Sequence, residues 1–238
     1  MYIPTLTHID QGYRFESVLP PEVKFEDGQK ETLVTEKLED SKIIVEAGCK
    51  ATLIAVLTEG TQPSTDPLLA SKAADIQIEF GGRGAELVML VFIVGREKDR
   101  FHFKTTSRHG VQGTKASYFV KGTMFEQSSA DYHGNLIIEK GADETDVYLA
   151  HHTLLLGPAA KANTFPGLEI EADEVKAGHA ATVGRVDEEV LFYLQARGFE
   201  KQEAEQLLVR GFFEDLLMKI ANESLRDDLR EKILARLP

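Results

Sequence analysis

Histidines are the side chains of this chain best placed by type and spacing to bind a metal. His151 and His152 are adjacent in one apolar run, and His179 lies in another. Neutral imidazole is a common ligand of iron and other transition metals. Because consecutive residues of a strand point to opposite faces, His151 and His152 cannot chelate one ion from a single strand. A metal here would need further ligands, from a partner subunit, carboxylates or external thiols.

The alternation of apolar residues places each histidine on a face. His179 shares its parity with Val175, Ala177, Ala181 and Val183, and His151 shares its parity with Val147, Leu149, Thr153 and Leu155. Two interpretations of His179 stay open. It is either a core histidine whose nitrogens bond to neighbouring carbonyls, or a ligand at a surface. We expect three further histidines, His102, His109 and His133, at the surface or in turns.

Cys49 is the only cysteine, which excludes an internal disulfide and fits a reducing compartment. Its sequence context is typical of a small buried hydrophobe. A metal site built from several thiolates cannot come from one chain with one cysteine.

Several catalytic classes lack their motifs here. The segment Gly81-Gly82-Arg83-Gly84 has no following Lys-Ser/Thr, so it predicts a turn and not a phosphate-binding loop. No Walker A motif, HExxH motif or Ser-His-Asp order is present. The sequence therefore indicates no ATPase or protease activity of its own.

Charge and hydropathy exclude some classes of binding partner. The net charge of −12 argues against nucleic acid, whose phosphates need a basic footprint. The apolar run Leu87–Val94 is far shorter than the ~20 residues of a membrane span. The first residues lack the pattern of a secretion signal, so we expect a cytoplasmic protein without membrane contact.

The chain divides into three parts. We expect an irregular capping segment over 1–40, a β core over 41–184 and a helical subdomain over 185–238. Turn signals recur about every 10 residues in the core, which suits a sandwich, a barrel or a solenoid. Similarity between 43–48 and 136–141 favours the solenoid. Helices are expected over 187–197, from about 200, and after a cap at Ser224.

One block resembles a known family. Pro166, Leu168-Glu169-Ile170, the run from Val175 to Gly184, and Phe192-Tyr193-Leu194-Gln195-Ala196-Arg197-Gly198 are similar to the C-terminal signature of the SufB/SufD family of iron–sulfur cluster assembly. Ala180, after His179, is a small residue as in SufD-type members, where SufB-type members have glutamate. The resemblance implies a right-handed parallel or mixed β-helix with C-terminal helices, in a short SufD-like member without the N-terminal helical region.

The resemblance also implies a function. The chain would be a non-catalytic scaffold that pairs with itself or with a longer SufB-like paralogue, as a homodimer or heterodimer. It implies a transient iron–sulfur cluster at the subunit interface near His179. Such clusters are usually held by four thiolates, which a chain with one cysteine cannot supply, so we expect the isolated chain to hold no stable cluster. His151 aligns with a cysteine that SufB-type members use. A SufC-like ABC ATPase would dock on the C-terminal helices, and the candidates are Phe192, Tyr193, Arg197, Phe212 and Phe213.

The alternative is a metal-dependent or carbohydrate-active enzyme on a β-helix. Such an enzyme would need convergent acids, bases or metal ligands on one face of the solenoid. The spacing of the histidines gives no such set.

Overall fold

A computed structural model describes residues 12–62 and 72–238 of the chain. Its strands form two sheets in which every neighbouring pair of strands is parallel. The seven-stranded sheet contains β1 (Arg14–Glu16), β3 (Lys30–Thr35), β5 (Lys50–Leu57), β7 (Glu86–Gly95), β9 (Lys115–Met124), β11 (Asp146–Leu155) and β13 (Lys176–Arg185). The six-stranded sheet contains β2 (Glu22–Phe25), β4 (Ser41–Val45), β6 (Ala74–Phe80), β8 (Arg100–His109), β10 (Ser129–Ile138) and β12 (Lys161–Ile170).

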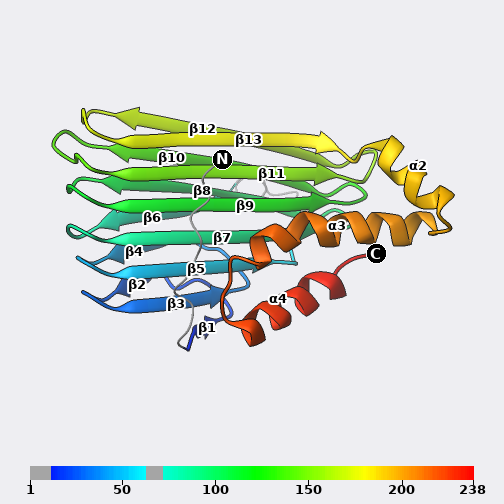
Figure 1. Ribbon diagram of the computed structural model, residues 1–238, viewed down its shortest axis with the longest axis horizontal. Coiled ribbons are helices and arrows are strands. Elements are labelled where there is room, and N and C mark those ends of the chain that lie inside the picture. Colours follow the sequence, from blue (N-terminus) through cyan, green and yellow to red (C-terminus); the bar gives the residue numbers. More distant parts are fainter. Residues whose placement is uncertain (1–11, 63–71) are drawn as a thin grey trace.

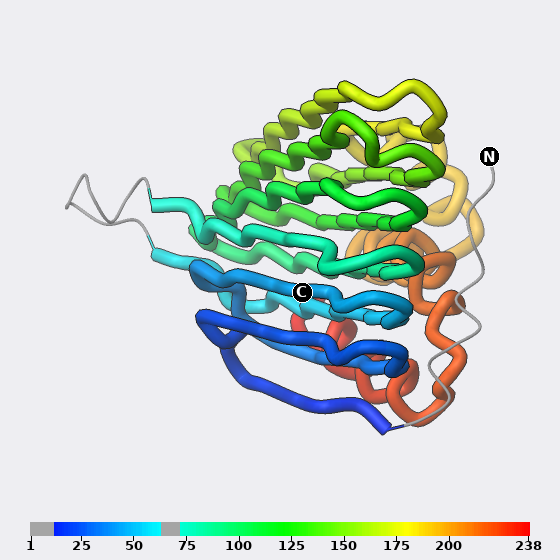
Figure 2. The backbone as a smooth tube through the Cα atoms, turned by 90° about the vertical axis from the view of Figure 1, so that its left-hand side faces the viewer, coloured from blue at the N-terminus to red at the C-terminus, as the bar shows by residue number. Residues whose placement is uncertain are grey.

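The two sheets are the walls of a β-helix. Consecutive strands alternate between the sheets, so each coil contributes one strand to each wall. In Figure 1 the seven-stranded sheet runs left to right in front, the other runs back behind it, and the chain rises by one coil each time. This sense is right-handed. Figure 2 shows the coils stacked from the blue end to the yellow end.

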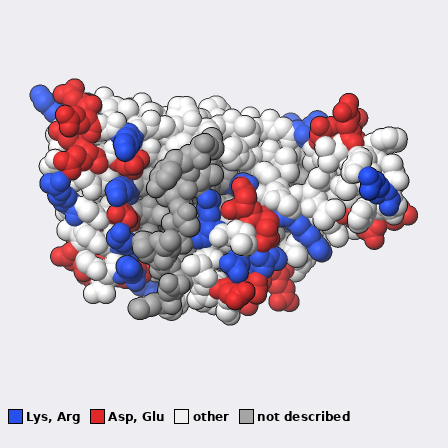
Figure 3. All heavy atoms as spheres, in the orientation of Figure 1, with Lys and Arg blue, Asp and Glu red and all other residues white. Residues whose placement is uncertain are grey.

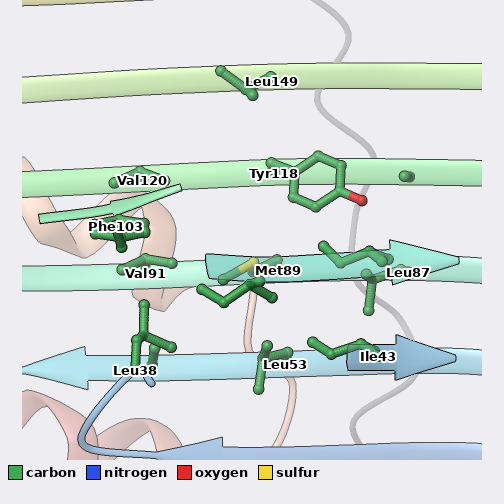
Figure 4. Packing of buried hydrophobic residues seen from close by; sticks show 14 of the residues in the cluster. Leu38, Ile43, Leu53, Leu87, Met89, Val91, Phe103, Tyr118, Val120 and Leu149 are labelled. Atoms are coloured by element: carbon green, nitrogen blue, oxygen red, sulfur yellow. The ribbon is translucent and has the colours of Figure 1, made fainter. Parts of the chain in front are cut away.

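Alternation in sequence produces the interior. In β8, Phe101, Phe103, Thr105, Ser107 and His109 are buried while the residues between them are not. Inward side chains of successive strands lie in register, so they form columns along the axis. One column contains Leu53, Met89, Tyr118 and Leu149, each beside the next (Figure 4). Burial of such apolar columns is the main favourable contribution to folding.

The turns stack as regularly as the strands. Gly84 has φ +76°, a conformation that glycine adopts without steric cost. Its amide donates to Gly113 O in the next coil at 3.1 Å, and Gly48 N donates to Arg83 O at 3.0 Å. Turn backbone groups are thereby bonded between coils.

Three helices follow the β-helix. They are α2 (Glu188–Ala196), α3 (Lys201–Leu217) and α4 (Glu223–Ala235). Helices α3 and α4 pack on the outer face of the seven-stranded sheet, while α2 extends past its end (Figure 1). Because this cover buries both faces of β7, that strand is apolar almost throughout. Basic and acidic side chains are interspersed over the same view (Figure 3).

The predicted β-helix with C-terminal helices is therefore confirmed. Two local expectations were wrong. The described part of 1–40 is not irregular, because it carries β1, β2 and β3, and β3 pairs with β5. Helix α4 is capped by Asn222, whose side chain accepts from Leu225 N, and not by Ser224. In the described residues, no helix has the length and apolar character needed to cross a bilayer.

Candidate functional site

The last coil of the β-helix ends in two open strand edges. β12 is the terminal strand of one sheet and β13 of the other. Apolar side chains are exposed on this coil: Phe165 is 54% exposed, Ile170 43% and Val183 38%. Unpaired edges with apolar side chains favour association with another chain.

His179 terminates an interior column. It lies beside Leu149, the last residue of the column that begins with Leu53. The predicted parity of β13 is therefore correct. Within residues 12–62 and 72–238 no further coil covers His179, and its side chain is exposed. The position suits the surface interpretation of this residue better than the core interpretation.

His151 lies one coil deeper and is fully buried. Its register partner is Ala181, two residues after His179 on β13, so both histidines occupy the inward face of the same sheet. Its Nε2 lies 3.0 Å from Thr153 Oγ1, and its ring meets the edge of Tyr132 with centroids 5.4 Å apart. Its Nδ1 has no hydrogen-bond partner in the described structure. Burial, with a smaller effect of His152, lowers the pKa of His151 to about 4, so the ring is neutral at pH 7.

His152 lies on the opposite side of the same sheet, as predicted. Its Nδ1 is 2.7 Å from Thr182 Oγ1 on β13. Burial and then the neighbouring Lys121 lower its pKa. Lys121 Nζ donates to Phe212 O at 2.6 Å and also bonds to Asp215, which ties β9 to α3. His152 thus belongs to the helix-docking surface, and His151 to the interior.

Helix α2 leaves its apolar side chains uncovered. None of its residues is buried, although Asp187 caps its first turn by accepting from Glu189 N at 2.8 Å. Phe192 is 73% exposed and Tyr193 55%, with the Arg197 guanidinium 4.9 Å from the Tyr193 ring centre. These three candidates therefore lie together at the surface.

The two candidates on α3 differ from those on α2. Phe213 is 1% exposed and packs against Phe92 with ring centroids 6.0 Å apart. Its packing on the β-helix accounts for its apolar character, so it is not accessible to a partner. Phe212 is half-buried under Lys121, whose Nζ lies 4.5 Å from its ring centre.

Most of the chain, including this region, matches a known protein family. Residues 70–212 match the family described as "SUF system FeS cluster assembly, SufBD core domain". The match covers more than half of the chain. The chain belongs to the SufB/SufD family. The matched range contains the open coil, His151, His179 and all of α2.

Curated proteins that are similar to this chain also bear SufD or SufBD family names. The chain is 36% identical over 118 residues to the iron–sulfur cluster assembly protein SufD of Escherichia coli K12, covering 50% of this chain and 28% of that protein. It is 34% identical over 160 residues to a SufBD family protein of Mycobacterium leprae, covering 64% and 41%. SufD of Bacillus subtilis is 34% identical over 137 residues, covering 58% and 31%. The aligned part thus spans less than half of each relative's length.

Sequence reasoning missed a buried polar network in this SufB/SufD core. His109 was expected at the surface or in a turn, but it is fully buried and stacked on Phe80. Its Nε2 lies 2.9 Å from Ser107 Oγ and its Nδ1 2.8 Å from Thr114 Oγ1. Tyr118 donates to Ser107 at 2.6 Å. The alternation of β8, in which His109 shares parity with buried aromatics, was the available signal.

The surface placement predicted for the other two histidines is correct. The His102 and His133 rings lie on the outer face of the six-stranded sheet with centroids 6.1 Å apart, and His133 stacks on Phe165.

Cys49 is a structural residue. It is fully buried in the first coils, and burial raises the pKa of its thiol to about 11. Within the described ranges, no group of three or more His, Cys, Asp or Glu side chains is arranged to hold a metal ion. A cluster held at the open coil would therefore need ligands from beyond these residues.

Proposed function

We propose that this chain is a non-catalytic scaffold subunit of SUF-type iron–sulfur cluster assembly. The observation that carries the proposal is the open last coil, where His179 is exposed beside the unpaired edges of β12 and β13. Family membership supports it, because the matched range is an iron–sulfur cluster assembly core domain. The same coil is the pairing surface in this proposal, with a second copy or a longer SufB-like paralogue as the partner.

The nascent cluster is cargo in this proposal and is held only at the subunit contact. His179 supplies an accessible imidazole, and the partner supplies the remaining ligands. His151 lies on the same inward face one coil away, with a neutral ring and an unpartnered Nδ1. A buried nitrogen without a hydrogen bond carries an energetic cost, which a ligand or water at this position would remove. His151 is therefore the second candidate ligand.

The motor of the assembly is a separate SufC-like ABC ATPase. Its proposed docking surface is the exposed group on α2, namely Phe192, Tyr193 and Arg197, and the half-buried Phe212 of α3 is a further candidate. Aromatic and arginine side chains dominate the binding energy of protein interfaces. A movement of α2 caused by the ATPase would be transmitted to the open coil, because only two residues lie between the end of β13 and the start of α2. The proposed location is the cytoplasm, where a thiol-poor chain of this kind needs no disulfide.

The experiment is anaerobic iron and sulfide loading of the complex of this chain with its SufB-like paralogue and its ATPase. The His179→Ala complex should lose most of the bound iron, measured by absorbance and metal analysis. The His152→Ala complex is the matched control, because His152 lies on the opposite face of the sheet from His151 and His179, beside Thr182. Equal loading of the two variants would remove His179 from the proposal, and failure of the three chains to associate would refute the scaffold role.

A further inference from the structure

The outer face of the six-stranded sheet carries a regular pattern of ion pairs. Four of the six lysines and arginines on its strands bond to a carboxylate of a neighbouring coil or turn. The pairs are Lys24–Glu46 at 3.0 Å, Lys42–Glu79 at 2.8 Å, Lys104–Asp75 at 2.7 Å and Arg108–Glu139 at 2.8 Å. On an acidic protein, with a net charge of −12, this pairing is the expected state of a surface cation.

Arg100 and Lys161 are the two exceptions. Among the residues that the structure describes, neither side chain has a carboxylate partner, and both are exposed. They are also neighbours in space, because Ser129 lies beside Arg100 on one side and beside Lys161 on the other. Two strand spacings separate them, about 9 to 10 Å between backbones. A hydroxyl thus stands between two cations that have no carboxylate partner in the described part of the chain.

Arg100, Ser129 and Lys161 form a row across three strands, and backbone hydrogen bonds fix the position of each. Thr61 N donates to Arg100 O at 2.9 Å, and Arg100 N donates to Thr61 O at 3.0 Å. Thr61 therefore pairs with the first residue of β8, whereas β6 pairs with β8 only from Phe103 onward. Ser129 N donates to Asp99 O at 2.8 Å, and Lys161 N to Ser128 O at 3.1 Å. The three side chains therefore project from fixed positions.

A groove of about 390 Å³ lies over the row. Its lining includes all three residues of the row and the amides of Gln127 and Asn163. Asp131 also lines it, and its Oδ1 accepts from Asn163 Nδ2 at 2.6 Å. The volume is within the usual range of small-molecule sites, about 300 to 1,000 Å³.

We propose that this groove binds the phosphate group of a small molecule. A phosphate monoester carries about −1.5 to −2 charges at neutral pH, which two unpaired cations match. The Arg100 guanidinium can bind two phosphate oxygens at once, the Lys161 ammonium a third, and the Ser129 hydroxyl donates between them. The proposal is independent of cluster assembly, since the row lies on the outer wall and His179 faces the inside.

The test is isothermal titration of the full chain at constant ionic strength with inorganic phosphate and with glycerol 3-phosphate. Saturable binding of one anion per chain is expected for at least one of them, and acetate should not bind. Arg100→Gln and Lys161→Gln should each weaken binding about tenfold, the effect of losing one charge-assisted contact. Arg108→Gln is the matched control, because it removes a cation of the same strand and face that Glu139 already neutralises.

The two anions separate the sources of the phosphate. Tighter binding of glycerol 3-phosphate indicates an organic phosphate that fills the groove, whereas equal binding indicates free phosphate; both support the site. Asp131→Asn should tighten binding, because it removes the one carboxylate among the described residues of the lining. Absence of saturable binding, or equal weakening by Arg100→Gln and Arg108→Gln, would overturn the proposal.

Discussion

Arg236 Nη2 donates to Asp99 Oδ2 at 2.8 Å, which joins the end of α4 to the turn between β7 and β8. The Asp99 side chain is 3% exposed and also accepts from Arg96 N and Gln62 Nε2. Arg96 in turn donates to Arg236 O at 3.3 Å. The apolar face of α4 packs on the sheet, but apolar contacts are not directional. The polar contact between Arg236 and Asp99 therefore sets the position of the C-terminal end of α4 on the sheet.

Replacing Arg236 by Met should destabilise the fold. The change keeps most of the apolar stem but removes one partner of a buried carboxylate. The expected loss is about 1 to 3 kcal/mol in the free energy of unfolding, measured by urea denaturation. Lys201→Met is the control, because the Lys201 side chain is 71% exposed and forms a surface ion pair with Glu205, so about 0.5 kcal/mol or less is expected. Equal effects of the two changes would contradict the proposed role of Arg236.

Two buried histidines should make stability fall in mild acid. Burial lowers the pKa of His109 to about 3 and is the main reason that the pKa of His151 is about 4. The unfolded chain, with histidine pKa values near 6.5, binds protons below that pH that the folded chain does not. The full contribution is therefore present above pH 6.5 and is lost as the pH falls toward 4.

The measurement is the slope of unfolding free energy against pH between 6 and 4.5. Each histidine contributes up to about 1.4 kcal/mol per pH unit. His109→Gln should lower the slope by about one such contribution, even though it also weakens the protein at pH 7.5 by disturbing the Ser107 and Thr114 bonds. His102→Gln, on the outer face of the sheet, is the matched histidine substitution outside the interior. An unchanged slope in His109→Gln would be the contrary result.

Parity was the part of this structure that the sequence predicted well. The alternation around His151 and His179 gives the correct face for both, because a strand has only two faces and apolar residues occupy the inner one. The helix predicted over 187–197 was also correct, since Asp187 provides a local cap. Signals that act within one strand or one turn are readable in this way.

The register and the contacts between coils could not be predicted from the sequence. Register depends on the length of each coil, which varies, and a sequence does not say that Ser129 stands between Arg100 and Lys161. For the same reason the pairing of β3 with β5 was missed in a segment that is mostly polar. The burial of Phe213 and the exposure of Phe192 depend on which side of each helix meets the sheet. Both helices have apolar positions, and only tertiary packing separates them.

Pairing through the open coil can be tested with Phe165. Phe165→Lys should weaken self-association, or association with the paralogue, because it replaces an exposed aromatic side chain of the terminal strand β12, which a partner would cover, by a charge. Light scattering over a concentration series measures this. Phe15→Lys is the matched control, since Phe15 is 51% exposed on β1, at the opposite end of the stack. If Phe15→Lys weakens pairing more than Phe165→Lys, the contact lies at the other end.

Docking of the ATPase can be tested on α2 without disturbing the fold. Because none of α2 is buried, Phe192→Ser should leave the urea midpoint of the isolated chain within error. It should nevertheless weaken binding of a SufC-like ATPase at least tenfold in surface plasmon resonance, as expected for a central aromatic contact. Met218→Ser, at a side chain that is 59% exposed at the far end of α3, is the control and should bind normally. Normal binding by Phe192→Ser and Tyr193→Ser together would show that the ATPase uses another surface.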